Sequence, residues 1–97
     1  MRKVIFDRVF EWDDEKNKLN KKKHGISFES AIWVFFDPHY VEFPDDIHSD
    51  DELRYKAIGI VNDLLVVICT DRGDTTRIIS ARGANAKERR FYNDNRA

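Results

Sequence analysis

The sequence of 97 residues has one cysteine, two prolines and no apolar run of the roughly 18 residues that a membrane-spanning helix requires. The single thiol, Cys69, excludes an internal disulfide and suits a reducing cytosol. The N-terminal residues lack the apolar stretch and the small-residue cleavage site of a secretory signal. We therefore expect one domain, located in the cytoplasm and not in a membrane.

The net charge of −1 conceals an uneven distribution of charge along the chain. Residues 37–52 hold seven acidic side chains and no Lys or Arg, whereas the rest of the chain carries 17 basic and 11 acidic side chains. A basic surface attracts the phosphate backbone of nucleic acids. Charged side chains can equally serve only to keep a small domain soluble, so charge leaves both interpretations open.

Capping signals and hydrophobic periodicity predict two helices in the first half of the chain. The first begins after Asp13, which can cap free N–H groups, and ends in a basic turn before Gly25. Leu19 is the only apolar residue of this segment, so we expect the helix to lie on the surface. Ser27 can cap a second helix from Phe28 to about Phe36, whose apolar stripe should face the core.

The second half of the chain has the pattern of an antiparallel meander. Three strands are expected, at residues 52–61, 64–70 and 75–82, and a short apolar–polar segment at 40–43 could add a fourth. A capping-box pattern at 85–88 then opens a last helix. The order of elements predicts an α+β fold with two N-terminal helices, a meander of three to four strands and a C-terminal helix.

Motifs spread over residues 10–92 occur in a specific order and spacing. They are Phe10-Glu11-Trp12-Asp13, Asn20, Lys23-His24-Gly25-Ile26, Phe28, Ala31, Val34-Phe35-Phe36-Asp37-Pro38, Glu52-Leu53-Arg54-Tyr55, Ile58-Gly59, Arg77-Ile78-Ile79-Ser80-Ala81-Arg82, and Glu88-Arg89-Arg90 with Tyr92. With these motifs the chain resembles the BrnT family of toxins, which belongs to the RelE-like superfamily. The resemblance implies a RelE-like fold and a metal-independent endoribonuclease that slows translation and growth.

The same resemblance implies the partners of the protein. The substrate would be RNA, and no cofactor would be needed. The inhibitor would be a BrnA-like antitoxin with a ribbon-helix-helix fold. We expect an antitoxin dimer to join two toxin copies and to bind its own operator DNA.

Metal-free RNA cleavage needs a group that exchanges protons near neutral pH and positive charge at the phosphate. Of the three histidines, only His24 stands in a basic setting, and we expect it to transfer protons beside Lys23, which could hold phosphate. By residue pattern alone, His24 could instead be a helix C-terminal residue next to Gly25. The family resemblance favours the catalytic role.

Arginines of the predicted strands are the candidates for contact with phosphate. We expect Arg77 to clamp the phosphate, with Arg54, Arg82 and Arg72 as further contacts. Strict alternation places Arg77 and Arg82 on opposite faces of one strand, so they can share a site only if a bulge or a strand end intervenes. Each strand arginine could instead form a cross-strand ion pair at the surface.

Three further groups carry alternative roles. Glu52 could accept a proton or orient an arginine, and Tyr92 could contact RNA or pack on the sheet. The spacing of the acidic residues near His48 matches no calcium loop, so we expect no metal site. These residues are Asp45, Asp46, Asp50 and Asp51.

Two functions are compatible with these patterns. One is the ribonuclease toxin, which His24 beside lysines and several arginines favours. The other is a non-catalytic protein-binding module of the same fold that acts through a partner in transcriptional autoregulation. The lack of a strong basic excess favours this second function, and the fold alone cannot decide between the two.

Overall fold

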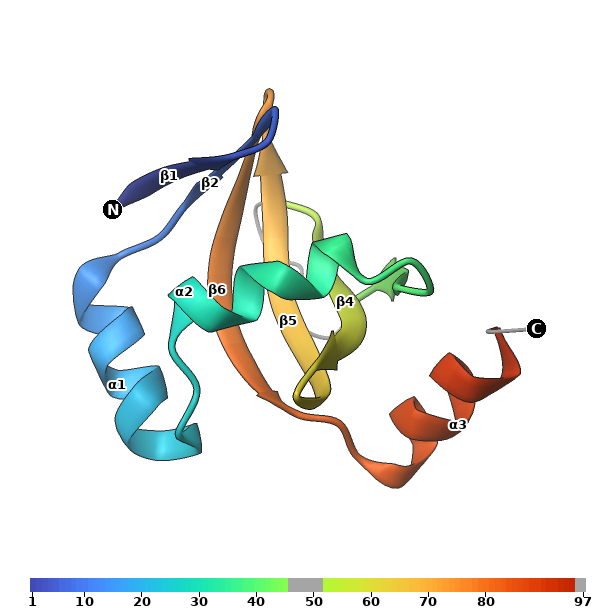
Figure 1. Cartoon of the computed structure of the whole chain (residues 1–97). Coiled ribbons are helices and arrows are strands. Elements are labelled where there is room, and N and C mark those ends of the chain that lie inside the picture. The colour runs from blue at the N-terminus through green and yellow to red at the C-terminus, as the bar shows by residue number, and fades with distance from the viewer. Residues whose placement is uncertain (46–51, 96–97) are drawn as a thin grey trace.

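The computed structural model describes residues 1–45 and 52–95, and in that part of the chain six strands form one sheet (Figure 1). The strands are β1 (Arg2–Ile5), β2 (Arg8–Glu11), β3 (Val41–Pro44), β4 (Arg54–Val61), β5 (Asp63–Arg72) and β6 (Thr75–Gly83). Their order across the sheet is β1-β2-β6-β5-β4-β3. Only β2 and β6 are parallel among the pairs of described strands.

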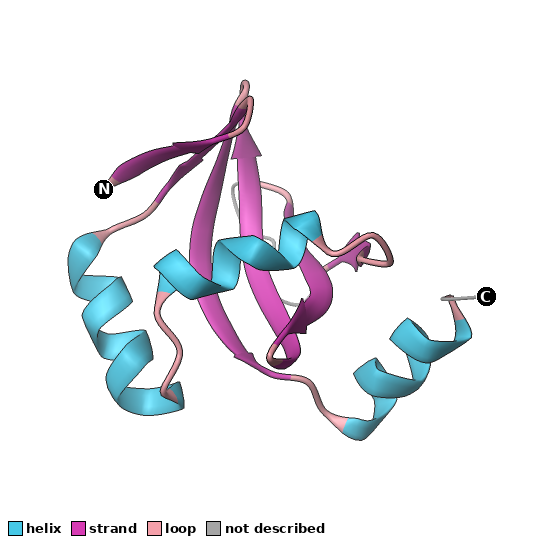
Figure 2. Cartoon of the chain, in the orientation of Figure 1, coloured by secondary structure: helices cyan, strands magenta, loops and turns pink. Residues whose placement is uncertain are grey.

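Three α-helices and one 3-10 helix complete the described structure (Figure 2). They are α1 (Asp14–His24), α2 (Phe28–Ala31), the 3-10 helix η1 (Ile32–Phe36) and α3 (Ala86–Asp94). Asp13 caps α1 by accepting hydrogen bonds from two backbone N–H groups, and Gly25 ends it in the left-handed conformation, as the sequence predicts. None of these helices is long and apolar enough to cross a membrane.

The predicted α+β class is confirmed, but the predicted layout of the sheet is wrong. A hairpin of β1 and β2 precedes the first helix, and it pairs with β6 in parallel orientation. The described sheet therefore has six strands in mixed orientation, not an antiparallel meander of three to four. The second predicted helix is α-helical only to Ala31 and continues to Phe36 as a tighter 3-10 helix.

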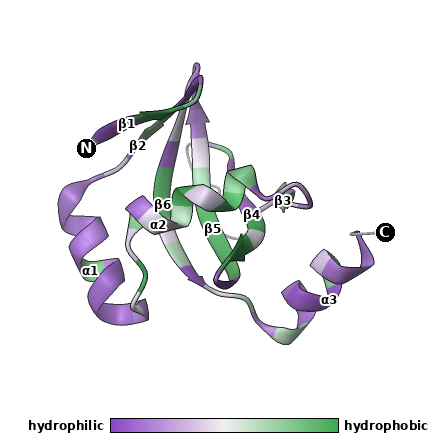
Figure 3. Cartoon of the chain, in the orientation of Figure 1, coloured by the Kyte–Doolittle hydropathy of each residue, from purple (hydrophilic) through white to green (hydrophobic). Residues whose placement is uncertain are grey.

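Each face of the sheet carries a hydrophobic core. On one face α2 and η1 pack against residues such as Phe10 and Val67, and on the other face Tyr92 of α3 packs against Ile58 and Val66. Figure 3 shows the corresponding contrast between the apolar central strands and the largely hydrophilic α1 and α3.

Helix α1 lies beside the lower half of β6, where β2 has already ended (Figure 1). β2 pairs with β6 only at residues 75–77. Further along β6, the Asn20 amide donates a hydrogen bond to the carbonyl of Ala81 at 2.9 Å and accepts one from its N–H at 3.0 Å. The side chain of Asn20 thus takes the place of a neighbouring strand, while Leu19 is exposed, as predicted.

Candidate functional site

The register of β6 against β5 shifts at Ile79, which forms a β-bulge. Before the bulge Arg77 pairs with Thr70, and after it Arg82 pairs with Val66. Thr70 and Val66 are four residues apart in β5, so their side chains point to the same face. The bulge that Arg77 and Arg82 need in order to share a face is therefore present.

Polar side chains form a row across this face, which is the face that also carries α3. In order across the sheet, the paired residues are Arg54, Thr70, Arg77, Glu11 and Arg2. Because neighbouring strands lie about 4.8 Å apart, Arg54 and Arg77 are roughly 10 Å apart at the backbone. Long guanidinium side chains at this separation can reach the same phosphodiester.

Arg54, Arg72 and Arg77 surround two carboxylates, Glu11 and Glu52, and we call these five residues the arginine cluster. Arg77 Nη1 lies 2.6 Å from Glu11 Oε2, and Arg72 Nη2 lies 3.2 Å from Glu52 Oε1. The hydrogen bond from Arg72, with the charges of Arg72, Arg54 and Arg77, lowers the pKa of Glu52. Glu52 is therefore an ionised carboxylate that can accept a proton, and the same lowering of its pKa makes it a weaker base.

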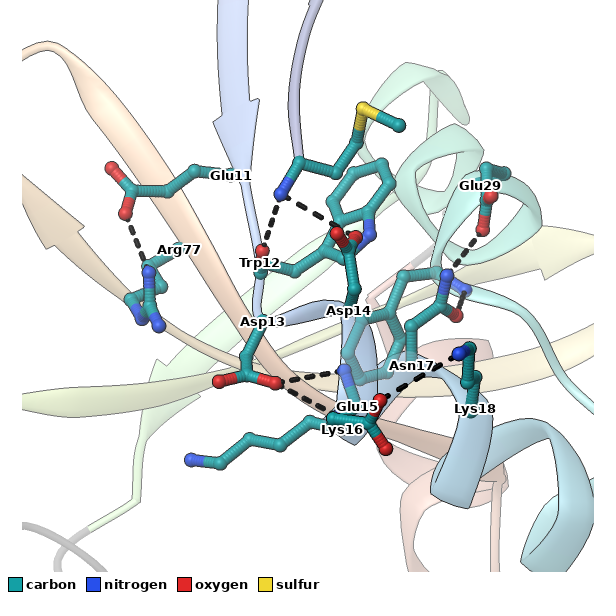
Figure 4. Close-up of polar contacts among 12 residues, drawn as sticks. Glu11, Trp12, Asp13, Asp14, Glu15, Lys16, Asn17, Lys18, Glu29 and Arg77 are labelled. Carbon is teal, nitrogen blue, oxygen red and sulfur yellow. Dashed lines mark hydrogen bonds and ion pairs between the residues drawn. The ribbon is translucent and has the colours of Figure 1, made fainter.

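The arginine cluster lies near the start of α1. Figure 4 shows Arg77 and Glu11 close to Asp13, the N-cap of α1. The charges of Lys16 and Arg77 both contribute to lowering the pKa of Asp13, although the hydrogen bonds from backbone N–H groups have the largest effect. The N-terminal end of α1 is thus part of the same electrostatic environment as the cluster.

Arg82 and Tyr92, two further predicted RNA contacts, hold α3 on the sheet. Arg82 donates to both carboxylate oxygens of Glu88, at 2.7 and 2.8 Å, and Lys56 Nζ lies 3.6 Å from Glu88 Oε2. The hydrogen bond from Arg82 lowers the pKa of Glu88 to about 2. The Tyr92 hydroxyl donates to Asp37 Oδ2 at 2.6 Å and its ring is buried, which is the packing alternative for this residue.

His24 and Lys23 lie at the opposite end of α1 from the arginine cluster. α1 has 11 residues and is therefore about 16 Å long. His24 borders a separate hollow of about 540 Å³, whose other lining residues include Lys21, Ser27, Ser30 and Asn62. The structure therefore brings together Arg54, Arg72, Arg77 and Glu52, but it does not bring His24 and Lys23 to them.

Some participants were not predicted from the sequence. Glu11 and Lys56 had no assigned role, although Glu11 lies inside a quoted motif and Lys56 follows Arg54 at the spacing of two that defines a strand face. Cys69 is buried, as expected, and burial raises its pKa to about 12. Of the acidic group, Asp45 is buried, and residues 46–51 lie outside the described part of the chain.

Comparisons with known proteins agree on one family. A family model described as the ribonuclease toxin BrnT of type II toxin–antitoxin systems matches residues 12–88. Among solved structures, the crystal structure of the ribonuclease toxin BrnT from Brucella abortus is similar, with a TM-score of 0.62 and 27% sequence identity. That match covers 78% of this chain and 95% of the Brucella chain. No curated protein sequence matches the chain.

Proposed function

The chain belongs to the BrnT family of ribonuclease toxins of type II toxin–antitoxin systems, and from this membership we propose that it is a metal-independent endoribonuclease acting at the arginine cluster. Its cleavage of cellular RNA would inhibit translation and growth. The observation that carries the proposal is the grouping of three arginines around the ionised carboxylate of Glu52 on one face of the sheet.

In the proposed cleavage reaction, the nucleophile is the 2′-hydroxyl of the RNA itself. This oxygen attacks the adjacent phosphorus, its proton passes to Glu52, and the bond from phosphorus to the 5′-oxygen breaks. The leaving oxygen takes a proton from water, and a 2′,3′-cyclic phosphate remains. Arg77, with Arg54 and Arg72, stabilises the negative charge that grows on the phosphate oxygens.

Variants of the cluster test this assignment on a labelled RNA. We expect Arg77→Ala and Glu52→Gln each to lower the cleavage rate about 100-fold, the usual scale for an electrostatic contact or a general base. Added chelator should leave the rate unchanged. Circular dichroism verifies that each variant is folded, and RNA left intact by the wild-type protein would contradict the proposal.

The role proposed for His24, with Lys23, is tested in the same assay. If catalysis takes place at the arginine cluster, His24→Gln cleaves at close to the wild-type rate because its side chain lies a helix length away. A loss of about 100-fold in His24→Gln, combined with full activity of Glu52→Gln, would move proton transfer to His24. Each outcome selects one of the two acid–base assignments.

Family membership also supports a protein partner. We propose a BrnA-like antitoxin with a ribbon-helix-helix fold that silences the toxin and binds operator DNA in complex with it. Expression of this chain alone should arrest growth and deplete cellular RNA, and co-expression of the antitoxin should restore growth. Normal growth with intact RNA, despite soluble protein, would argue against a toxin.

One observation favours the alternative of a non-catalytic regulatory module. Arg77 and Arg72 are already paired with Glu11 and Glu52, as in ordinary surface ion pairs. In that case the cluster would only stabilise the fold, and Glu52→Gln would change neither growth nor RNA. The function to measure would then be the binding of operator DNA by the complex of this chain with the antitoxin.

A further inference from the structure

Two asparagines show how helix α1 is oriented: Asn20 marks the side that faces β6, and Asn17 marks the side that faces α2. Asn20 points to β6 through its hydrogen bonds with Ala81. Asn17 points to α2, because it accepts a hydrogen bond from the Phe28 N–H at 2.8 Å and donates one to Glu29 at 2.7 Å. One flank of α1 therefore faces the layer of α2, and the other faces away from it.

Lys16 and Lys23 lie on the flank away from α2. With 3.6 residues per turn, both are rotated by roughly 40° to 60° from Asn20, in the direction opposite to Asn17. Lys21 lies on the α2 side, consistent with its effect on the pKa of Glu29 and with its place in the hollow beside His24. Lys16 and Lys23 thus share the side of the sheet that carries the arginine cluster.

The ammonium groups of these two lysines are not held in ion pairs with carboxylates of the described residues. Over residues 1–45 and 52–95 neither Lys16 nor Lys23 forms an ion pair, whereas Lys18 on the outer side of α1 pairs with Glu15 at 3.6 Å. Both lysines are exposed. An exposed ammonium group that is not held in an ion pair is available to bind phosphate.

Lys16 and Lys23 also continue the arginine cluster in space. Lys16 shares the electrostatic environment of Asp13 with Arg77, so the row of cations starts at the cluster (Figure 4). Lys23 follows seven residues later, about 10 Å further along the helix axis. A mononucleotide held at the cluster does not extend over this distance, but a strand of several nucleotides does.

We propose that Lys16 and Lys23 form a lysine track along which single-stranded RNA runs away from the arginine cluster. The inference rests on the proposed ribonuclease function, and it assigns to α1 the binding of nucleotides outside the scissile bond. It also gives Lys23 a role in binding that does not require it to reach the reacting phosphate. An acidic protein partner is the other occupant that such a track could attract, and the experiment separates the two.

The test compares two double variants of one helix with the same change in charge. Lys16→Gln with Lys23→Gln removes the track, and Lys18→Gln with Lys22→Gln removes two lysines from the outer side of α1. Binding of a 2′-O-methyl oligonucleotide, which cannot be cleaved, is measured over a range of salt concentrations. Circular dichroism verifies that both double variants are folded.

We expect the track variant to bind about tenfold more weakly at 0.1 M salt, and its salt dependence to fall by about 1.4, or 0.7 per lost phosphate contact. The outer variant should stay within about twofold of the wild type. The deficit of the track variant should shrink for a dinucleotide, which spans only the arginine cluster. Equal losses of RNA affinity in both double variants would mean that all lysines of α1 attract RNA nonspecifically, and would overturn the proposed track.

Other outcomes also decide the inference. If the track variant keeps its affinity for RNA but loses the antitoxin in a co-purification, the lysines belong to the protein interface and the RNA track is wrong. If the wild type cleaves RNA but both variants bind like it, only the track fails. If the wild type neither binds nor cleaves RNA, the proposed function fails with it.

Discussion

The side-chain amide of Asn20 and the main chain of Ala81 form two hydrogen bonds, of 2.9 and 3.0 Å, through which a helix completes the edge of a β-sheet. Asn20 also donates to the carbonyl of Ile26 at 2.9 Å, which fixes the chain after α1. One buried amide thus joins α1, the connection to α2 and β6. These contacts explain why a helix with almost no apolar surface is held at a defined place.

Replacing Asn20 should therefore be costly. Asn20→Ala leaves the buried N–H and C=O groups of Ala81 without partners, and we expect a loss of about 2 to 4 kcal/mol in the free energy of unfolding. Urea denaturation followed by circular dichroism measures the loss. Leu19→Ala, next to it but exposed, is the control and should change stability by less than about 0.5 kcal/mol. Similar stability of Asn20→Ala and the wild type would show that the edge contact is dispensable.

Gly59 tests the close packing of η1 on β4. A Cβ at this position would lie 2.7 Å from the backbone oxygen of Val34, so Gly59→Ala must push η1 away from the sheet. We expect a loss of about 1 to 3 kcal/mol, the range for overpacked cores. Gly83→Ala is the matched control, because a Cβ there meets no atom within 4 Å. Thermal denaturation of the two variants should separate them clearly.

Glu88 should make stability depend on pH. Its pKa is lowered to about 2 in the folded protein, chiefly by the hydrogen bond from Arg82, so its contribution is present above the unfolded pKa near 4.5 and is lost as the pH falls towards 2. Glu88→Gln should cost about 2 to 3 kcal/mol at pH 7, somewhat less than for a fully buried pair because Arg82 is partly exposed.

The pH profile supplies the control for this pair. The stability difference between Glu88→Gln and the wild type should narrow between about pH 4.5 and pH 2. Glu15→Gln alters an exposed pair with Lys18 and should show no such profile. A difference that is constant from pH 7 to pH 2 would mean that Glu88 acts through its shape and not through its charge.

The antitoxin should be recovered with the toxin as a defined complex. We expect an antitoxin dimer joined to two copies of this chain, because the ribbon-helix-helix fold proposed for the antitoxin is itself a dimer. Light scattering of the co-purified pair measures the mass, and operator DNA should shift in a gel only with the antitoxin present. A chain that purifies alone when co-expressed with its antitoxin would contradict this assembly.

Local signals predicted the elements whose ends are chemically marked. Asp13 and Gly25 bound the first helix, and the capping box of Asn85 and Glu88 opens the last, as found. The N-terminal hairpin was not predicted, because strands of four residues give little periodicity. Its turn also lacks a typical turn residue, since Phe6 occupies the position with a φ of 54°. Its parallel pairing with β6 depends on contacts between distant segments, which periodicity does not report.

The part of the candidate site that depends on strand pairing could be predicted from the sequence. The pairing of the strands gathered Arg54 and Arg77, but alternation alone would have separated Arg77 from Arg82. The extra residue at Ile79 leaves no mark in the pattern of apolar side chains, so the shared face could be stated only as a condition. The separation of His24 from the arginines depends on the placement of α1, which the hydrogen bonds of Asn20 and Asn17 fix.

In the arginine cluster, the carboxylates of Glu11 and Glu52 are built-in counterions of Arg77 and Arg72. A phosphate that binds Arg77 or Arg72 must displace a carboxylate of the protein rather than dissolved salt. The net free energy of binding a nonspecific polyanion is therefore small. A strand that completes this exchange at both arginines would be retained. Nucleic acids that fit the cluster poorly would then be bound only briefly, and the protein would stay available for strands that fit it.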